Sequence, residues 1–340
     1  MNNRSSDLNS NAADPQSAPA AKTYKMPSII TITFNPALDK SLSIPNLVPD
    51  KKLRCSAAVY EPGGGGINVA RAIKHLGGKA AAVYLSGGDA GRKITRMLTD
   101  DNIESIPIEI AECTRENLVV ADIAGKKQYL FDMPGPEVTT HEWKKCLDVV
   151  TNLQGIEYMV VSGSLAPGVP DDVYEQLSLI AKQKNARLIV DTAGEGLKRA
   201  VQAGVYLVKP NARELAKLVG KEELDNDSIT DAAQQLIGNG NCEAVVVSMG
   251  RAGAILVTKD AVLEIPAPDT EQAKSTVGAG DSMVAGIVMG LTAGKTLPEA
   301  VQFGVACGTA ATLHAGTELC KREDVEKLYN LIKDQACCAI

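Results

Sequence analysis

Ser28-Ile-Ile-Thr-Ile-Thr-Phe34 is a run of β-branched and apolar residues with almost no polar interruption. A strand that is apolar throughout has to be covered on both faces, as in parallel sheets with helices on each side. Similar runs alternate with helical stretches along the chain, which favours parallel strands joined by crossover helices. The further strands that we predict span residues 80–85, 158–162, 187–191, 207–209, 244–248 and 253–257. The sequence therefore predicts an α/β fold with a doubly wound, mostly parallel sheet flanked by helices, and ligands at the carboxyl ends of its strands.

Two other stretches, 41–60 and 112–131, alternate apolar with polar residues, and the second contains the turn Ala124-Gly-Lys126. This alternation is typical of antiparallel strands with one solvent-facing side. We expect a small β-sheet lid that covers the site or pairs with the same sheet of a second subunit. Residues 27–335 then form one domain, preceded by a disordered tail, 1–26, rich in Ser, Asn, Ala and Pro.

Composition excludes several classes of function. The net charge of the 340 residues is -6, which leaves no broad positive field for nucleic acid. No apolar run approaches the roughly 20 residues of a membrane span. The eight cysteines form no C-x-x-C pair, so zinc spacing is absent and reduced thiols in a cytoplasmic protein are the simplest interpretation.

The first chemical motif is Pro62-Gly63-Gly64-Gly65-Gly66-Ile67-Asn68, followed by an amphipathic helix. Glycines allow a ligand to approach the backbone, and a helix N-terminus offers unpaired N–H groups. Asn68 can both donate to and accept from a sugar hydroxyl. The alternative is a flexible turn with Asn68 as a helix N-cap, although four successive glycines are entropically costly for a turn alone.

The second motif is Lys209-Pro-Asn211-Ala-Arg-Glu214, where a predicted strand gives way to a helix. Asn211 and Glu214 are three residues apart and share one face of that helix. Their oxygens could hold a hydrated Mg²⁺ beside a nucleotide. The same residues also match a capping box, and the two interpretations are compatible.

The third motif is Ser275-Thr-Val-Gly278-Ala279-Gly280-Asp281, followed by a helix of small residues. The N–H groups of Gly278, Ala279 and Gly280 can face the negative charge of a transferring phosphoryl group, reinforced by the helix dipole. Asp281 is then placed to accept a proton from an attacking hydroxyl. The alternative is a carboxylate that only complements the helix dipole.

Two rival nucleotide motifs fail. Gly294-Lys295-Thr296 ends like a P-loop, but the required first glycine is Met289 and a helix precedes it. A G-x-G-x-x-G turn after a strand, the mark of dehydrogenases, is also missing.

With these three motifs in this order, the chain resembles the PfkB/ribokinase family of sugar kinases over residues 28 to about 335. Within that family, Lys51-Lys-Leu-Arg-Cys55, the run 61–73 and Phe303-Gly-Val-Ala306 are most similar to the minor bacterial 6-phosphofructokinases. Relatives that use fructose 1-phosphate or tagatose 6-phosphate commonly carry lysine where this chain has Gly65. Asn35-Pro-Ala-Leu-Asp39 is typical of the branch that uses phosphorylated sugars.

The resemblance implies a set of roles for individual residues. Asp281 with Gly278, Ala279 and Gly280 would be catalytic. The sugar phosphate would contact Asp39, Gly63, Gly64, Asn68, Arg115 and Ser164. ATP would contact Lys209, Asn211, Ser248, Gly250, Arg251, Gly253, Gly278 and Gly280, with Lys52 reaching across a homodimer built through the lid strands. Glu214 and Asn211 would hold Mg²⁺, and Ser275, Val277, Ala311 and Gly316 a monovalent cation such as K⁺.

The sequence departs from the family pattern at two positions. Ala166 stands where relatives usually have proline, and His314 where the nearest branch has asparagine; the second affects the cation loop. The expected reaction is phosphorylation of the C1 hydroxyl of fructose 6-phosphate by ATP. Tagatose 6-phosphate kinase and 1-phosphofructokinase are alternatives, and a silent sugar-phosphate-binding regulator is a third.

Overall fold

The computed structural model describes residues 26–238, 242–270, 273–314 and 318–338. The first part contains β1 (Ile29–Thr33), β2 (Ala37–Ile44), β3 (Val59–Gly63), α1 (Gly65–His75), β4 (Ala81–Ser86), α2 (Gly88–Asp100), β5 (Glu104–Glu109), β6 (Arg115–Asp122), β7 (Lys127–Phe131), α3 (Thr140–Asn152) and β8 (Tyr158–Ser162). The second contains α4 (Val173–Lys184), β9 (Arg187–Asp191), α5 (Gly194–Ala203), β10 (Val205–Val208), α6 (Ala212–Leu218), α7 (Asn226–Gly238), β11 (Cys242–Ser248), β12 (Ala254–Thr258), β13 (Val262–Ile265), α8 (Ala279–Thr292), α9 (Leu297–Thr312) and α10 (Arg322–Cys338).

The main sheet has nine strands in the order β13-β12-β11-β10-β9-β8-β1-β4-β5. The strands from β5 to β11 in this order run parallel. At one edge, β12 runs antiparallel to both of its neighbours, β11 and β13. The chain passes from β1 outward to β4 and β5, then returns to β8 on the other side of β1. This reversal creates a crevice at the carboxyl ends of β1 and β8, the position where sheets of this kind bind ligands.

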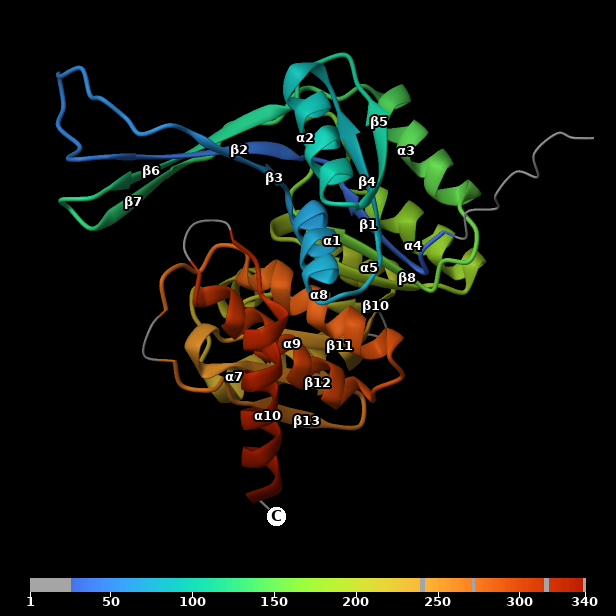
Figure 1. The fold of residues 1–340 in the computed structure, drawn as a ribbon. Coiled ribbons are helices and arrows are strands. Elements are labelled where there is room, and N and C mark those ends of the chain that lie inside the picture. The colour runs from blue at the N-terminus through green and yellow to red at the C-terminus, as the bar shows by residue number, and fades with distance from the viewer. Residues whose placement is uncertain (1–25, 239–241, 271–272, 315–317, 339–340) are drawn as a thin grey trace, which may run out of the picture.

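Helices cover both faces of the main sheet (Figure 1). On one face α1, α2, α8, α9 and α10 pack against residues such as Val160 and Leu207. On the other, α3 to α7 pack against the alternate side chains, such as Met159 and Val208. The predicted doubly wound α/β fold is therefore confirmed. The expectation that these strands are covered on both faces also holds, because β1, β8 and most of β4 are buried.

Two strands of the main sheet, β5 and β13, were not predicted from the sequence. Both lie at edges of the sheet and are largely exposed, so neither has a continuous apolar run. Pro107 lies inside β5, which is possible because an edge strand leaves one row of backbone groups unpaired.

A separate sheet of four strands, in the order β3-β2-β6-β7, projects from the main body (Figure 1). The prediction of a small sheet is confirmed, but the strand boundaries are partly wrong. Strand β2 begins at Ala37 and β3 ends at Gly63, whereas residues 45–58 contain no strand. Pro45, Pro49 and the positive φ of Asp50 account for that interruption. Whether the sheet acts as a lid stays a prediction.

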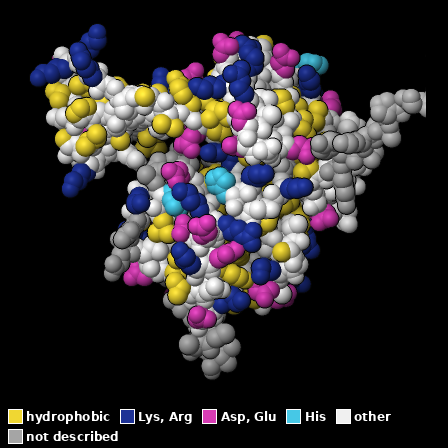
Figure 2. All heavy atoms as spheres, in the orientation of Figure 1, with side chains coloured by type: hydrophobic (Ala, Val, Ile, Leu, Met, Phe, Trp, Pro, Cys, Tyr) yellow, Lys and Arg dark blue, Asp and Glu magenta, His cyan; other side chains and the backbone are white. Residues whose placement is uncertain are grey.

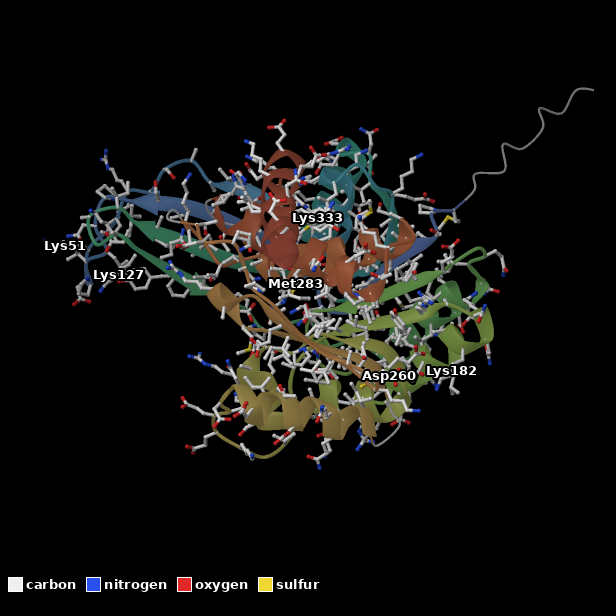
Figure 3. All side chains as sticks on the ribbon, turned by 90° about the horizontal axis from the view of Figure 1, so that it is seen from below. Lys51, Lys127, Lys182, Asp260, Met283 and Lys333 are labelled. Atoms are coloured by element: carbon white, nitrogen blue, oxygen red, sulfur yellow. The ribbon has the colours of Figure 1, made fainter. Side chains whose placement is uncertain are left out.

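Figure 3 shows how far this part of the molecule projects: Lys51, on the loop between β2 and β3, and Lys127, at the start of β7, both lie at its far end, while Met283 of α8 lies near the middle of the molecule. Hydrophobic side chains gather on the projecting sheet (Figure 2). Across the part of the chain that the structure describes, no helix has both the length and the apolar character needed to cross a membrane. The predicted tail, 1–26, lies outside the described residues except for Met26.

Candidate active site

Asp281 lies in the first turn of α8 and lines the crevice. Its Oδ2 accepts a hydrogen bond of 3.0 Å from Nδ2 of Asn68, on α1. Its Oδ1 accepts a bond of 3.2 Å from Oγ of Ser162, at the end of β8. The carboxylate is therefore held from two elements distant in sequence rather than only capping its own helix.

The electrostatic surroundings of Asp281 suit a general base. Burial and the neighbouring carboxylate of Asp191 raise the pKa of Asp281 to about 7, against the lowering effect of Asn68, Lys209 and Ser162. A base whose pKa lies near the working pH is both unprotonated and able to take up a proton. The structure thus places at this point a carboxylate with the properties expected of a proton acceptor.

Gly278, Ala279 and Gly280 form the turn at the N-terminus of α8, which begins at Ala279. Gly278 is the helix N-cap and has a φ of 75°, a left-handed conformation that suits glycine. The first N–H groups of a helix have no carbonyl partner within it, so a helix N-terminus can bind an anion. Of the three N–H groups at this turn, that of Ala279 makes a long bond of 3.4 Å to the carbonyl of Thr276. A side chain at Gly280 would place its Cβ 3.4 Å from Nζ of Lys209, which shows that the ammonium lies beside the same turn.

Lys209 and Asp191 form a buried ion pair, with 3.2 Å between Nζ and Oδ1. Burial lowers the pKa of Lys209, but Asp191, Glu214 and Asp281 outweigh it and raise the pKa above its ordinary value. Lys209 is therefore a permanent cation next to the glycine turn. Together with the N–H groups it can bind a phosphate.

The glycine run brings the backbone against two other segments. A Cβ at Gly63 would lie 2.1 Å from Oδ2 of Asp39, and one at Gly65 would lie 2.3 Å from Oγ of Ser162 and 2.7 Å from the backbone nitrogen of Gly163. Gly64 has a φ of 107°. These positions exclude side chains for steric reasons, so the run is more than a flexible turn.

Asp39, on strand β2 of the small sheet, lies beside the glycine run at Gly63. Asp39 accepts a bond of 2.9 Å from Asn117, its cross-strand neighbour, while Glu61 lies opposite it on β3. Burial, reinforced by Glu61, raises the pKa of Asp39, and Asn117 and Arg115 oppose this. Asp39 can thus accept hydrogen bonds from the hydroxyls of a sugar.

Arg115 and Ser164 are linked through Asn35. The guanidinium of Arg115 donates to the carbonyl of Asn35 at 3.2 Å and pairs with Asp132, and Nδ2 of Asn35 donates to Oγ of Ser164 at 3.0 Å. Asn35 follows β1 and Ser164 follows β8, so this link crosses the switch point. A cavity of about 580 Å³ opens here, lined among others by Gly65, Ser164 and Asp281.

Asn211 and Glu214 form the capping box of α6. Oδ1 of Asn211 accepts from the N–H of Glu214 at 2.9 Å, and Oε2 of Glu214 accepts from the N–H of Asn211 at 2.8 Å. Among the described residues, no group of three or more His, Cys, Asp or Glu side chains could hold a metal. Glu214 nevertheless lines the cavity together with Asp191 and Asp281. This excess of carboxylates fits a hydrated Mg²⁺ that arrives with phosphates.

Further predicted nucleotide residues lie beside this helix. Ser248 ends β11, forms a bridge with Asn211 and donates its N–H to the carbonyl of Pro210 at 2.9 Å. The turn Gly250–Ala252 contains Arg251, whose side chain is exposed. A side chain at Gly253 would clash with the carbonyl of Ile265 at 2.0 Å. Lys52, in contrast, lies on the exposed loop between β2 and β3 and is not brought to the site within one chain.

The predicted cation residues are brought together in part. The carbonyl of Thr312 accepts from the N–H groups of Lys274 at 2.7 Å and Ser275 at 3.4 Å, so the segment with Ser275 and Val277 lies against the end of α9. Ala311 is in that end, and its carbonyl accepts from the N–H of His314 at 3.2 Å. A carbonyl retains a second lone pair, so these groups fit a monovalent cation. Gly316 lies outside the described residues.

Four residues of the site were missed in the sequence: Ser162, Asp191, Asn35 and Asn117. Ser162 and Asp191 end predicted strands, and a polar residue at the carboxyl end of a parallel strand is a usable signal. Asn35 belongs to the Asn35–Asp39 pattern. No pattern in the sequence indicated Asn117, because its contact with Asp39 depends on the register between β2 and β6.

Comparison with known proteins agrees with this geometry. Residues 28–324 match the family described as pfkB family carbohydrate kinase. The chain belongs to this family of kinases. A relative named ATP-dependent 6-phosphofructokinase isozyme 2, from Escherichia coli K12, is 42% identical over 305 residues, covering 89% of this kinase and 98% of the relative. A relative named 1-phosphofructokinase, from Bacillus subtilis, is 32% identical over 90% of this kinase and 98% of the relative.

The kinase is also similar to solved structures. Phosphofructokinase-2 from E. coli in complex with potassium is 41% identical, with a TM-score of 0.87 over 91% of this kinase and 100% of that chain. A structure of the tetrameric inhibited form of the same E. coli protein gives a TM-score of 0.85 at 41% identity, with the same coverage of both chains. The resemblance to the PfkB/ribokinase family that the motifs predicted is thus confirmed.

Proposed function

We propose that this kinase is an ATP-dependent 6-phosphofructokinase, which phosphorylates the C1 hydroxyl of fructose 6-phosphate to give fructose 1,6-bisphosphate. The observation that carries the proposal is the position of Asp281, held by Asn68 and Ser162 on one side and adjoining the Gly278–Gly280 turn on the other. A hydroxyl next to Asp281 would have a proton acceptor and a phosphate site within reach. The name of the E. coli relative with 42% identity supports the choice of substrate.

The site residues have different roles in the proposed phosphoryl transfer. Asp39, Asn68, Gly63 and Gly64 would hold the sugar, and Arg115 and Ser164 its phosphate. Asp281 would take the proton from the C1 hydroxyl. Lys209 and the N–H groups of Gly278, Ala279 and Gly280 would stabilise the charge on the transferring phosphoryl group. Asn211, Ser248, Gly250, Arg251 and Gly253 would contact the nucleotide.

Two cations are part of the proposal. Mg²⁺, held by Glu214 with Asn211 nearby, would neutralise phosphate charge in a site that otherwise contains three carboxylates around one ammonium. K⁺ would lie behind the glycine turn, at carbonyls of Ser275, Val277 and Ala311. The similar E. coli structure, which is a complex with potassium, supports this second site.

We also propose that two copies pair through their small sheets. Among the described residues, six of the ten large hydrophobic side chains that are exposed lie on this sheet or the segments next to it: Leu47, Val59, Ile123, Leu130, Phe131 and Met133. A cluster of that kind favours an interface. In such a dimer Lys52 could reach the nucleotide of the partner subunit. The similar E. coli protein is described in a tetrameric inhibited form, which supports association between copies of this chain.

One steric observation separates the proposed activity from its nearest alternatives. Kinases of tagatose 6-phosphate and fructose 1-phosphate commonly carry lysine at the position of Gly65. Here a Cβ at Gly65 would lie 2.6 Å from the backbone carbon of Ser162 as well as 2.3 Å from its Oγ. This backbone therefore favours the branch with glycine.

A coupled assay of ADP release tests the proposal. The panel contains fructose 6-phosphate, tagatose 6-phosphate, fructose 1-phosphate and free fructose, each with and without Mg²⁺ and K⁺. We expect fructose 6-phosphate to give the highest kcat/KM. Turnover of another sugar with none of fructose 6-phosphate would overturn the substrate, and no turnover of any sugar would favour a regulator.

A further inference from the structure

Arg71 is an arginine buried close to the catalytic carboxylate without contacting it. It lies on α1, one turn after Asn68, and only 8% of its surface is exposed. Its guanidinium donates to the carbonyl of Pro62 at 3.0 Å and pairs with Glu61 at 3.1 Å. Both acceptors belong to β3 of the small sheet. Arg71 thus joins that sheet to α1.

Arg71 also faces the side chain on which Asp281 depends. Its NH1 nitrogen lies 3.5 Å from Oδ1 of Asn68, while Nδ2 of the same amide donates to Asp281. A guanidinium has only donors, so it favours the amide oxygen on its side. The N–H₂ end of Asn68 is then turned towards the carboxylate.

The two orientations of the Asn68 amide have opposite effects on Asp281. In the observed one, an N–H donor stabilises the charged carboxylate. In the flipped one, Oδ1 would face the carboxylate, and two acceptors repel each other unless Asp281 carries a proton. The other groups that face Asp281 are Ser162 from β8, Asp191 from β9 and Lys209 beyond β10.

We propose that Arg71 is a positioning residue: it holds Asn68 with its N–H₂ group towards Asp281, and it ties this orientation to strand β3 of the small sheet. The inference rests on the proposed function, since it takes Asp281 as the base. Movement of β3 at Glu61 and Pro62 would thereby reach the base through two side chains. Arg71 touches neither sugar nor nucleotide in this scheme.

The test compares Arg71→Lys and Arg71→Met with wild-type enzyme. Lysine keeps a charge beside Glu61 but cannot reach Glu61, Pro62 and Asn68 at once, because it lacks the planar fork. We expect kcat to fall about tenfold in both variants, because the hydrogen bond from Asn68 to the charged Asp281 weakens. The KM for ATP should stay constant. The acidic limb of the kcat/KM profile should move to higher pH, because Asp281 is more easily protonated when Asn68 no longer donates to it.

A control variant and a double substitution distinguish a positioning role of Arg71 from a purely structural one. Arg187 donates to Tyr158 at 3.2 Å, and both residues lie at the amino ends of their strands, away from the site. Arg187→Lys should therefore leave both kcat and the acidic limb unchanged. In an Asn68→Ala background, Arg71→Lys should have no further effect on kcat, because the amide is gone.

Other results would contradict the inference. An Arg71→Lys enzyme with a lower Tm but an unaltered kcat and pH profile would show a structural role alone. Full additivity with Asn68→Ala would show that Arg71 does not act through Asn68. Should Arg71→Met fail to fold, Arg71→Lys decides the matter. A wild-type enzyme without kinase activity would instead reject the proposed function.

Discussion

Nζ of Lys209 lies 3.2 Å from Oδ1 of Asp191, and 6% and 15% of the two side chains are exposed. A buried ion pair of this kind is costly to break, because the remaining charge stays without a partner. The pair also adjoins the turn at Gly280. Lys209 therefore stabilises the fold through this pair and lies where it can bind a phosphate.

Replacement of Lys209 by methionine should lower the free energy of unfolding by about 3 kcal/mol, as Asp191 is left unpaired in the interior. Urea denaturation measures this change. Lys198→Met is the matched control, because Lys198 pairs with Glu195 at 3.6 Å on the surface and its loss should have little effect. An equal loss in both variants would show that burial of the Lys209 pair has no special weight.

The pH dependence of kcat/KM should show an acidic limb near pH 7, where Asp281 gains a proton and ceases to be a base. In Asp191→Asn the limb should move down by about one pH unit, because a like charge is removed. The phosphate of the substrate titrates identically in both enzymes, so the difference belongs to the protein. An unmoved limb would mean that Asp281 does not control it.

The raised pKa of Asp281 also makes the stability of the fold depend on pH. The folded protein holds this proton up to about pH 7, whereas the unfolded chain loses it near the ordinary value of 3.8. Above the lower value the unfolded state binds fewer protons, so this group makes the fold less stable as pH rises through that window. In Asp281→Asn the free energy of unfolding should fall less steeply as pH rises, which urea titrations between pH 5 and about 7.5 can follow.

Asp281→Asn should lower kcat by at least about 100-fold, since asparagine cannot take up the proton of the hydroxyl. The KM for the sugar phosphate should change little. Asp171→Asn is a control in the same cavity, because Asp171 lines it without a bond to Asn68. Near-normal turnover of Asp281→Asn would remove it as the base.

Gly65→Ala should destabilise the protein by about 2 kcal/mol, since the added methyl group overlaps Ser162 and Gly163. Because Ser162 donates to Asp281, kcat should fall as well. Gly238→Ala is the control: its Cβ would meet nothing within 4 Å, at the end of α7. Thermal unfolding and the ADP assay report the two effects. If Gly65→Ala proved as harmless as Gly238→Ala, the close contact would be disproved.

Charges on the small sheet should split the proposed dimer. Val59→Asp with Leu130→Asp places two carboxylates on side chains that are 60% and 58% exposed. Light scattering should then give the mass of a monomer. Leu179→Asp, at a residue 59% exposed on α4, should leave the assembly intact. Dimers that persist in the double variant would place the interface elsewhere.

The sequence alone determined the class of the fold and the chemical motifs. The inner strands could be predicted because burial on both faces requires continuous apolar runs, as at β1 and β8. The turn Gly278–Asp281 and the run Gly63–Gly66 could be recognised because each is local, and glycine is needed there for reasons of space or conformation. Exposed edges such as β13 have no such requirement, and they were missed.

Only the tertiary structure decided which side chains meet. Asn68 and Asp281 are 213 positions apart, and Ser162 and Asp281 are 119 apart, so no local pattern links them. The pairing of Asp191 with Lys209 follows from the neighbouring positions of β9 and β10 in the sheet. Strand order and register are collective results of packing, and a pKa depends on distance and burial rather than on sequence spacing. The motifs therefore pointed to Asp281, whereas the assembled fold gives this carboxylate the surroundings that a base requires.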